Sequence, residues 1–143
     1  MRYIITIEDC KIFKLKKISD IRGNLTVIEG LRDVPFDIKR VYYTYDVPSG
    51  EYRGEHAHKT LKQLMVAVSG SFDVHLDDGI SKKVVTLNRP YLGLYIAEMI
   101  WRYIDNYSSG AVSLVLASDF YYENDYIRNY DDFLREKGVI RRK

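Results

Sequence analysis

The chain has 143 residues, of which 29% are charged and 46% are hydrophobic, with a net charge of +2. This composition is typical of a globular protein, and the length fits one domain with a core that needs no disulfides. The small net charge argues against a nucleic-acid-binding surface, and no apolar run approaches the ~20 residues that cross a bilayer. We therefore expect a single domain over residues 1–143 with neither nucleic acid nor membrane as a partner.

The N-terminal segment indicates a cytoplasmic location. Glu8 and Asp9 come too early for a secretory signal, and no small-residue cleavage site follows. The single cysteine, Cys10, has no internal partner for a disulfide, in agreement with a reducing compartment. We expect Cys10 to be an inert packing residue.

In chain order, the sequence consists of short strand-like segments separated by turns. The segments are residues 10–18, 25–29, 38–45, 63–68, 71–76, 82–87, 91–96, 99–104 and 111–117. They are rich in β-branched and aromatic residues or alternate between apolar and polar residues. Strands with turn signals roughly every 8–12 residues predict a β-sandwich or barrel.

Only near the end of the chain does the spacing of apolar residues change from that of a strand to that of a helix. The apolar residues Tyr126, Ile127, Tyr130, Phe133 and Leu134 form a helical stripe, which the following glycine at position 138 would end. The pattern predicts a helix over residues 124–137. Such a helix packs on the outside of the barrel or forms an interface, and we favour the packing role.

The segment 53–59 reads Arg-Gly-Glu-His-Ala-His-Lys and holds two of the three histidines. In an extended strand, residues i and i+2 point to the same face, so His56 and His58 should lie side by side. Imidazole changes its charge near neutral pH, with a reference pKa of about 6.5, so the pair could move protons or bind a metal. We expect the third histidine, His75, to be a surface or packing residue.

The pair, followed eleven residues later by Ser69-Gly70, resembles the first motif of the cupin superfamily, whose members are jelly-roll β-barrels. Metal-binding cupins carry a glutamate after the pair and a histidine in a second motif. Here residues 59–63 contain no carboxylate, and Arg102 occupies the place of the second-motif histidine. A guanidinium is cationic and has no lone pair for a metal, so we expect no metal and no other cofactor. A metal-dependent cupin remains an alternative.

A closer resemblance covers most of the chain. Segments 20–23, 36–43, 53–59, 76–79, 93–95, 116–121 and 125–128, together with Trp101, are similar to the WxcM-like cupins. This group includes dTDP-4-keto-6-deoxyglucose 3,4-ketoisomerases. The resemblance implies a metal-free isomerase that moves a sugar carbonyl from carbon 4 to carbon 3, making precursors of the 3-amino or 3-acylamido sugars of bacterial surface glycans.

The resemblance also suggests roles for individual residues. One of His56 and His58 is expected to be the base at carbon 3, and the other to move the proton onward; the sequence leaves their order open. Arginines 40, 53 and 102 are candidates for pyrophosphate or enediolate contacts. Tyr42 and Tyr43 alternate faces, so one should line the cavity and the other pack outside. Tyr42 has the same parity as Arg40, and we favour this pair as the one inside. The expected substrate-binding residues are Arg22, Arg40, Tyr42, Arg53, Lys59, Gln63, Tyr95 and Arg102.

Two further expectations come from the resemblance. Arg22 is typical of members that give a galacto product and Arg102 of those that give a gluco product, and we favour the galacto, fucose-type product. Family members form homodimers with exchanged N-terminal strands, which we expect here, with a monomer as the alternative. Two other functions remain open, a cupin-type sugar-nucleotide 3,5-epimerase and a non-catalytic cupin that only binds a sugar nucleotide.

Overall fold

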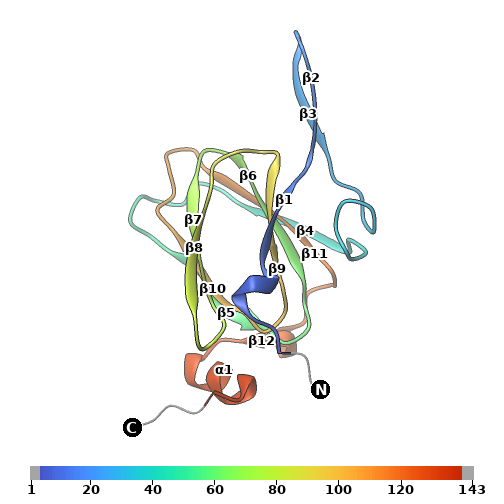
Figure 1. The fold of residues 1–143 in the computed structure, drawn as a ribbon. Helices are drawn as coiled ribbons and strands as arrows, with labels where there is room; N and C mark the ends of the chain where they lie inside the picture. The colour runs from blue at the N-terminus through green and yellow to red at the C-terminus, as the bar shows by residue number, and fades with distance from the viewer. Residues whose placement is uncertain (1–3, 140–143) are drawn as a thin grey trace.

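The computed structural model describes residues 4–139, which form two facing antiparallel sheets (Figure 1). The first sheet has the order β1 (Lys11–Lys14), β9 (Leu92–Ile96), β6 (Gln63–Ser69), β11 (Val112–Ala117) and β4 (Arg40–Thr44). The second has the order β12 (Tyr126–Ile127), β5 (Arg53–His58), β10 (Trp101–Asp105), β7 (Phe72–Asp77) and β8 (Lys82–Leu87). This confirms the predicted all-β barrel with a short C-terminal helix. The expectation of one domain over residues 1–143 stays a prediction and extends beyond the described residues.

The main core lies between the two sheets. Met65 and Leu94 of the first sheet and Phe72, Val74 and Leu76 of the second are almost completely buried there. Each strand alternates its side chains between faces, so every second residue enters this space. Full burial of each such side chain contributes about 1.5–3 kcal/mol relative to exposure.

The outer face of the first sheet is covered as well. Leu64 and Val66 point away from the main core and pack against Val34 and Phe36, which belong to the long loop between β3 and β4. Both faces of β6 are therefore buried. This explains why its sequence reads as a nearly continuous apolar run instead of alternating.

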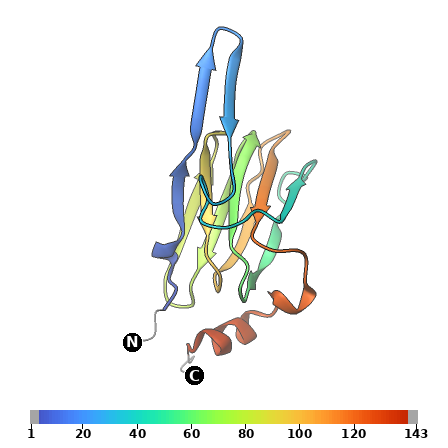
Figure 2. The same cartoon turned by 90° about the vertical axis from the view of Figure 1, so that its right-hand side faces the viewer.

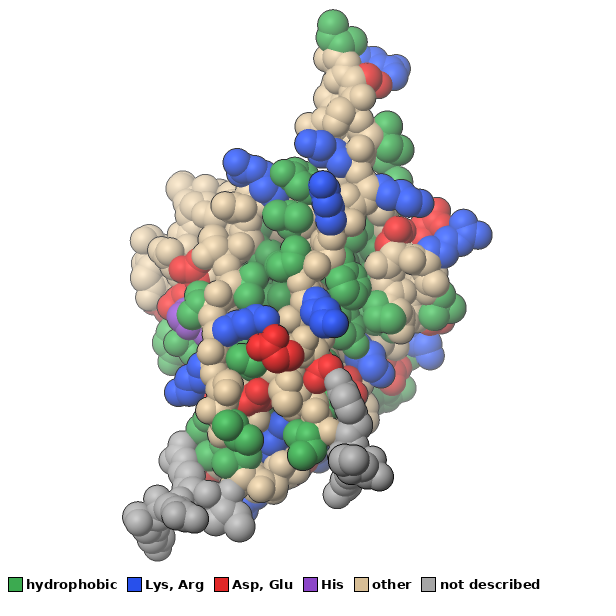
Figure 3. Space-filling view, in the orientation of Figure 1, with side chains coloured by type: hydrophobic (Ala, Val, Ile, Leu, Met, Phe, Trp, Pro, Cys, Tyr) green, Lys and Arg blue, Asp and Glu red, His purple; other side chains and the backbone are tan. Residues whose placement is uncertain are grey.

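A two-stranded hairpin projects from the barrel (Figures 1 and 2). It consists of β2 (Lys16–Asp20) and β3 (Gly23–Val27), which pair only with each other. The predicted strand 10–18 is thus divided, with Leu15 buried between β1 and β2. Ile18 and Leu25 of the hairpin are more than half exposed. Figure 3 shows that Lys and Arg side chains are scattered over the hairpin and the adjoining face, with acidic groups between them.

The C-terminal prediction is correct at the end of the helix but wrong at its beginning. A short 3-10 turn, η2 (Glu123–Asp125), comes first, and α1 (Tyr130–Lys137) begins only after Asn129, whose side chain caps it. The other 3-10 turn, η1 (Ile7–Asp9), precedes β1. Residues 126 and 127 form β12 instead, because they pair with β5. Gly138 ends α1 with φ 83°, as the sequence predicts. No helix in residues 4–139 is long and apolar enough to span a membrane.

Helix α1 lies across the end of the barrel opposite the hairpin (Figure 2). Its buried residues, Phe133 and Leu134, join a small cluster with Trp101 and Ile127. The helix therefore has the packing role that we favoured, and it fixes the 121–128 segment beside β5.

Candidate active site

A cavity of about 450 Å³ opens between the sheets beside the histidine motif. Strands β4, β5, β6, β10 and β11, the loop between β10 and β11, and residues of the segment 121–128 supply its walls. Its lining includes Arg40, Tyr42, Thr44, Arg53, His56, Met65, Arg102, Tyr107, Ser113, Tyr121, Tyr126 and Arg128. Arginine and tyrosine thus dominate the polar lining, which suits an anionic ligand with a ring system.

A bulge in β5 determines which residues face the cavity. Against β10, Arg102 pairs with His56 while Ile104 pairs with Arg53, so β5 contains one extra residue in this interval. Gly54 has φ 75° there, a conformation that glycine adopts at low cost. The extra residue brings Arg53 to the same side as His56, although a regular strand would place them on opposite faces.

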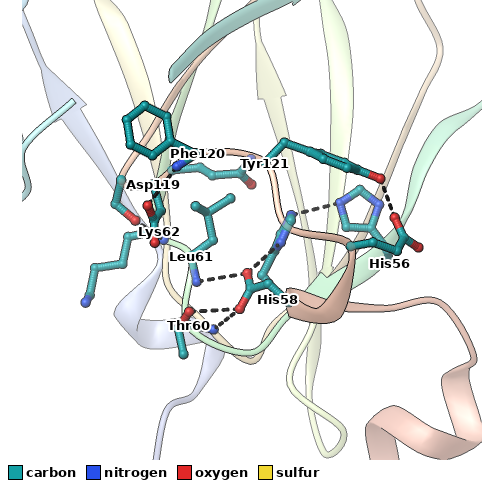
Figure 4. A network of polar contacts seen from close by, with 12 residues as sticks. His56, His58, Thr60, Leu61, Lys62, Asp119, Phe120 and Tyr121 are labelled. Carbon is teal, nitrogen blue, oxygen red and sulfur yellow. Dashed lines mark hydrogen bonds and ion pairs between the residues drawn. The ribbon is translucent and has the colours of Figure 1, made fainter. Parts of the chain in front are cut away.

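The two histidines lie in contact but differ in their access to the cavity. Their Nε2 atoms are 3.1 Å apart, and the rings meet edge to face. His56 lines the cavity, whereas His58 is completely buried behind it. On the far side of His58, Nδ1 is 3.1 Å from Asp125 Oδ2, so His58 lies between His56 and a carboxylate (Figure 4).

Burial keeps both imidazoles neutral. Burial, reinforced by the positive charge of Arg102, lowers the pKa of His56 and of His58 to about 2. Each ring then has one protonated nitrogen and one with a free lone pair. A neutral imidazole that faces a cavity is ready to accept a proton.

A second chain of hydrogen bonds runs behind the cavity wall. Arg102 donates Nη1 to Gln63 Oε1, and Gln63 Nε2 donates to the Tyr42 hydroxyl over 2.8 Å. Arg102 is 2% exposed, and among the described residues its buried Nη2 has no hydrogen-bond partner. Burial raises the pKa of Tyr42, so its hydroxyl stays protonated and can donate a hydrogen bond. This wall therefore offers a cationic donor and a neutral donor to a developing oxyanion.

Aromatic and cationic side chains surround the cavity mouth. The guanidinium of Arg40 lies over the rings of Tyr42 and Tyr121, at 5.4 and 5.6 Å from their centroids. Tyr126 packs against both histidines, with ring centroids 4.9 Å from His56 and 4.3 Å from His58. These contacts hold the rim residues in place before a ligand arrives.

The structure brings five of the ten predicted site residues to the cavity wall: Arg40, Tyr42, Arg53, His56 and Arg102. The expected parity of Arg40 and Tyr42 is confirmed, since Tyr43 is 60% exposed on the other face. Gln63 and His58 lie directly behind the wall, each bonded to a lining residue.

Three predicted site residues lie elsewhere in this chain. Tyr95 faces outward because its neighbours Leu94 and Ile96 occupy the core, and its ring stacks on Phe13 at 5.5 Å. Lys59 follows the buried end of β5 and lies on the surface, with Nζ 3.9 Å from Glu136. Arg22 is at the tip of the projecting hairpin, paired with Asp20. Strand alternation and chain direction therefore keep all three out of the chain's own cavity.

Sequence reasoning assigned no site role to Tyr121, Tyr126, Arg128 or Asp125. Asp125, Tyr126 and Arg128 were missed because we predicted a helix from residue 124, and a helical segment would not run beside β5. The pairing of residues 126 and 127 with β5 places them there. His75 is outside the cavity, 2.7 Å from Asp105 and stacked on Tyr103, as expected of a surface or packing residue.

The side chains around His56 and His58 do not fit a divalent metal ion. The third position that a cupin metal site would use is occupied by the buried guanidinium of Arg102, which repels cations and donates no lone pair. In residues 4–139, no cluster of three or more histidine, cysteine or carboxylate side chains is arranged to hold a metal.

Comparisons with known proteins agree with the motifs. The family model described as WxcM-like, C-terminal, matches residues 8–138. The chain is 49% identical over 123 residues to the TDP-4-oxo-6-deoxy-alpha-D-glucose-3,4-oxoisomerase of Aneurinibacillus thermoaerophilus, covering 86% of this chain and 88% of the relative.

Two solved structures have the same fold along almost their whole length. The TDP-quinovose 3,4-ketoisomerase of Campylobacter jejuni is 52% identical, with a TM-score of 0.87 over 90% of this chain and 99% of that one. A mutant 3,4-ketoisomerase of Thermoanaerobacterium thermosaccharolyticum, solved with TDP-4-keto-6-deoxyglucose, is 43% identical, with a TM-score of 0.90 over 92% and 96%. With its histidine pair, arginine-lined cavity and family match over residues 8–138, this chain belongs to the WxcM-like family and is a TDP-sugar 3,4-ketoisomerase.

Proposed function

We propose that the chain converts dTDP-4-keto-6-deoxy-D-glucose to a 3-keto-6-deoxyhexose by proton transfer through His56 and His58, without a metal. The observation that carries the proposal is the position of a neutral His56 in the wall of a cavity that is also lined by arginines. The name of the 49% identical relative and the ligand in the Thermoanaerobacterium structure support the choice of substrate.

His56 is the base at carbon 3 in this proposal. It is the histidine that lines the cavity, while His58 is completely buried behind it and relays the proton. His56 Nε2 faces His58, so Nδ1 is the nitrogen left to meet the substrate. The hydrogen on carbon 3 is acidic because it is adjacent to the carbon 4 carbonyl.

The reaction is a balanced internal redox change. As the C3–H bond breaks, its proton goes to His56, its electron pair forms the C3–C4 double bond, and the carbonyl pair moves to O4. A proton moves from O3 to O4, carbon 4 takes a proton back, and the pair on O3 forms the new carbonyl. Arg102, whose Nη2 has no hydrogen-bond partner within residues 4–139, stabilises the enediolate oxygen.

The rim residues bind the nucleotide end of the substrate. Arg40 and Arg53 line the cavity and contact the pyrophosphate, for which a guanidinium offers paired donors. Tyr121 is the candidate for stacking on the nucleotide base. It lies at the cavity rim and is 55% exposed.

The configuration at carbon 4 distinguishes two products, a galacto and a gluco sugar. We predicted the galacto, fucose-type product because Arg22 is typical of members that make it, and that prediction is untested. The gluco product is favoured by the position of Arg102 in the cavity wall and by the name of the 52% identical TDP-quinovose relative. The proton coupling at carbon 4 of the product distinguishes the two.

We also propose that two chains form a homodimer by exchanging their N-terminal strands. The hairpin projects from the barrel, exposes Ile18 and Leu25, and holds Arg22 away from its own cavity. A partner would bury these side chains. Light scattering tests this: a monomeric wild type contradicts it, and replacing both apolar residues with aspartate should shift a dimer toward monomer.

The test of the activity is proton NMR of dTDP-4-keto-6-deoxyglucose with chelator-treated protein in heavy water. Loss of the carbon 3 proton with appearance of a 3-keto product supports the proposal. Exchange at carbon 5 would instead indicate a 3,5-epimerase, and binding without exchange would indicate a non-catalytic cupin. The cytoplasmic location and the role in surface-glycan synthesis stay predictions.

A further inference from the structure

We propose that Asp125 is a positioning residue that sets the direction of the hydrogen bonds through His58 to His56, and so decides which nitrogen of His56 is free to act as a base. The proposal rests on the proposed function of His56. Asp125 itself does not line the cavity and acts only through the two imidazoles.

The carboxylate of Asp125 is held firmly in place. Its Oδ1 accepts from the backbone N–H of Thr60 over 2.9 Å and from the Thr60 hydroxyl over 2.8 Å. Its Oδ2 accepts from the N–H of Leu61 over 3.3 Å and lies 3.1 Å from His58 Nδ1. The loop between β5 and β6 therefore fixes both oxygens, and one of them points at the buried histidine (Figure 4).

The chemistry of the donor and acceptor sites determines the tautomers. An ionised carboxylate only accepts hydrogen bonds, so His58 must carry its proton on Nδ1. His58 Nε2 then has a lone pair and accepts from His56 Nε2, 3.1 Å away. His56 is left with its lone pair on Nδ1. In residues 4–139, no protein group bonds that nitrogen.

The same arrangement gives the proton a path during the reaction. When His56 Nδ1 takes the proton from carbon 3, His56 can release its other proton from Nε2 to His58 Nε2. His58 then carries the positive charge next to the Asp125 carboxylate, which stabilises it. The transfer reverses when the proton returns to carbon 4, so no proton is gained or lost in a turnover.

The test is Asp125→Asn, with Asp105→Asn as the matched control. In the variant the amide oxygen keeps the two shorter bonds, from Thr60, at the cost of the 3.3 Å bond from the Leu61 N–H. The amide NH₂ then faces His58 and forces the His58 proton onto Nε2. The chain of bonds then reverses, and His56 carries its proton on Nδ1. The control carboxylate, Asp105, bonds His75 over 2.7 Å outside the cavity and should affect neither tautomer.

Two measurements are made on the full chain, imidazole ¹⁵N NMR and steady-state kinetics. We expect the wild type to show His58 protonated on Nδ1 and His56 on Nε2, and Asp125→Asn to show both reversed. We expect kcat of Asp125→Asn to fall about 10²- to 10⁴-fold while KM changes less than about threefold. Asp105→Asn should keep wild-type values.

Each outcome decides a separate question. Wild-type His58 protonated on Nε2 would overturn the inference without any variant, even where Asp125→Asn fails to fold. Unchanged tautomers or near-normal kcat in a folded Asp125→Asn variant would also overturn it. A wild type that isomerises nothing would refute the proposed function, while its tautomers would still support or refute the arrangement of Asp125, His58 and His56.

Discussion

Acid should destabilise this protein through its two neutral, buried histidines. Their pKa values are about 2 in the folded state and about 6.5 in the unfolded chain. Below pH ~6.5 the unfolded chain therefore binds protons that the folded protein does not, and the free energy of unfolding falls with pH. For each group the loss between pH ~7 and pH ~5 is about 2 kcal/mol, so the pair accounts for about 4 kcal/mol.

The assay is urea unfolding at the two pH values. The double variant His56→Gln, His58→Gln should lose about 4 kcal/mol less than the wild type over this interval. The matched variant His75→Gln keeps the pair and should retain the wild-type loss. An equal loss in the double variant and the wild type would refute the reasoning, because the pair would then titrate alike in the folded and unfolded states.

Three further changes have defined outcomes. Arg102→Met removes the guanidinium that stabilises the enediolate, so kcat/KM should fall about 10²- to 10³-fold. The same guanidinium helps to lower the pKa values of the histidine pair, so the pH profile of kcat/KM should gain a decline on the acid side. A flat pH profile would contradict this. Gly70→Ala places a Cβ 2.8 Å from Ala111 Cα at φ +67°, so the free energy of unfolding measured in urea should fall by about 1–3 kcal/mol. The matched variant Gly110→Ala has a similar φ but nothing within 4 Å of its Cβ, and it should lose less. Exhaustive chelation should leave kcat unchanged, and a loss restored by one added metal would overturn the metal-free mechanism.

The sequence alone was enough to predict the β-rich fold and part of the cavity wall. Apolar alternation identified the strands, and the shared parity of Arg40 and Tyr42 correctly predicted that both side chains lie on one face, which is the cavity side. The end of the last helix was predictable too, because Gly138 adopts a backbone conformation that glycine favours. These features depend on residues that are close together in the chain.

The helix start and the position of Tyr95 depended on contacts that local patterns do not contain. Residues 126 and 127 carry apolar side chains at helical spacing, yet pairing with β5 draws them into a strand. Tyr95 is on the outer face because Leu94 and Ile96 face the other sheet. Parity states which residues share a face, and only packing decides which face is inside.

The histidine motif of residues 53–59 likewise combines features that the sequence predicts with features that only the structure shows. Its two histidines were evident from the sequence, as was their capacity to move protons. Only the tertiary structure placed His56 in the cavity wall and His58 behind it, and brought Asp125 to His58 from 67 residues away. The physical reason is that spacing along a strand fixes the relative direction of two side chains, whereas burial and hydrogen-bond partners come from segments that meet only when the barrel closes.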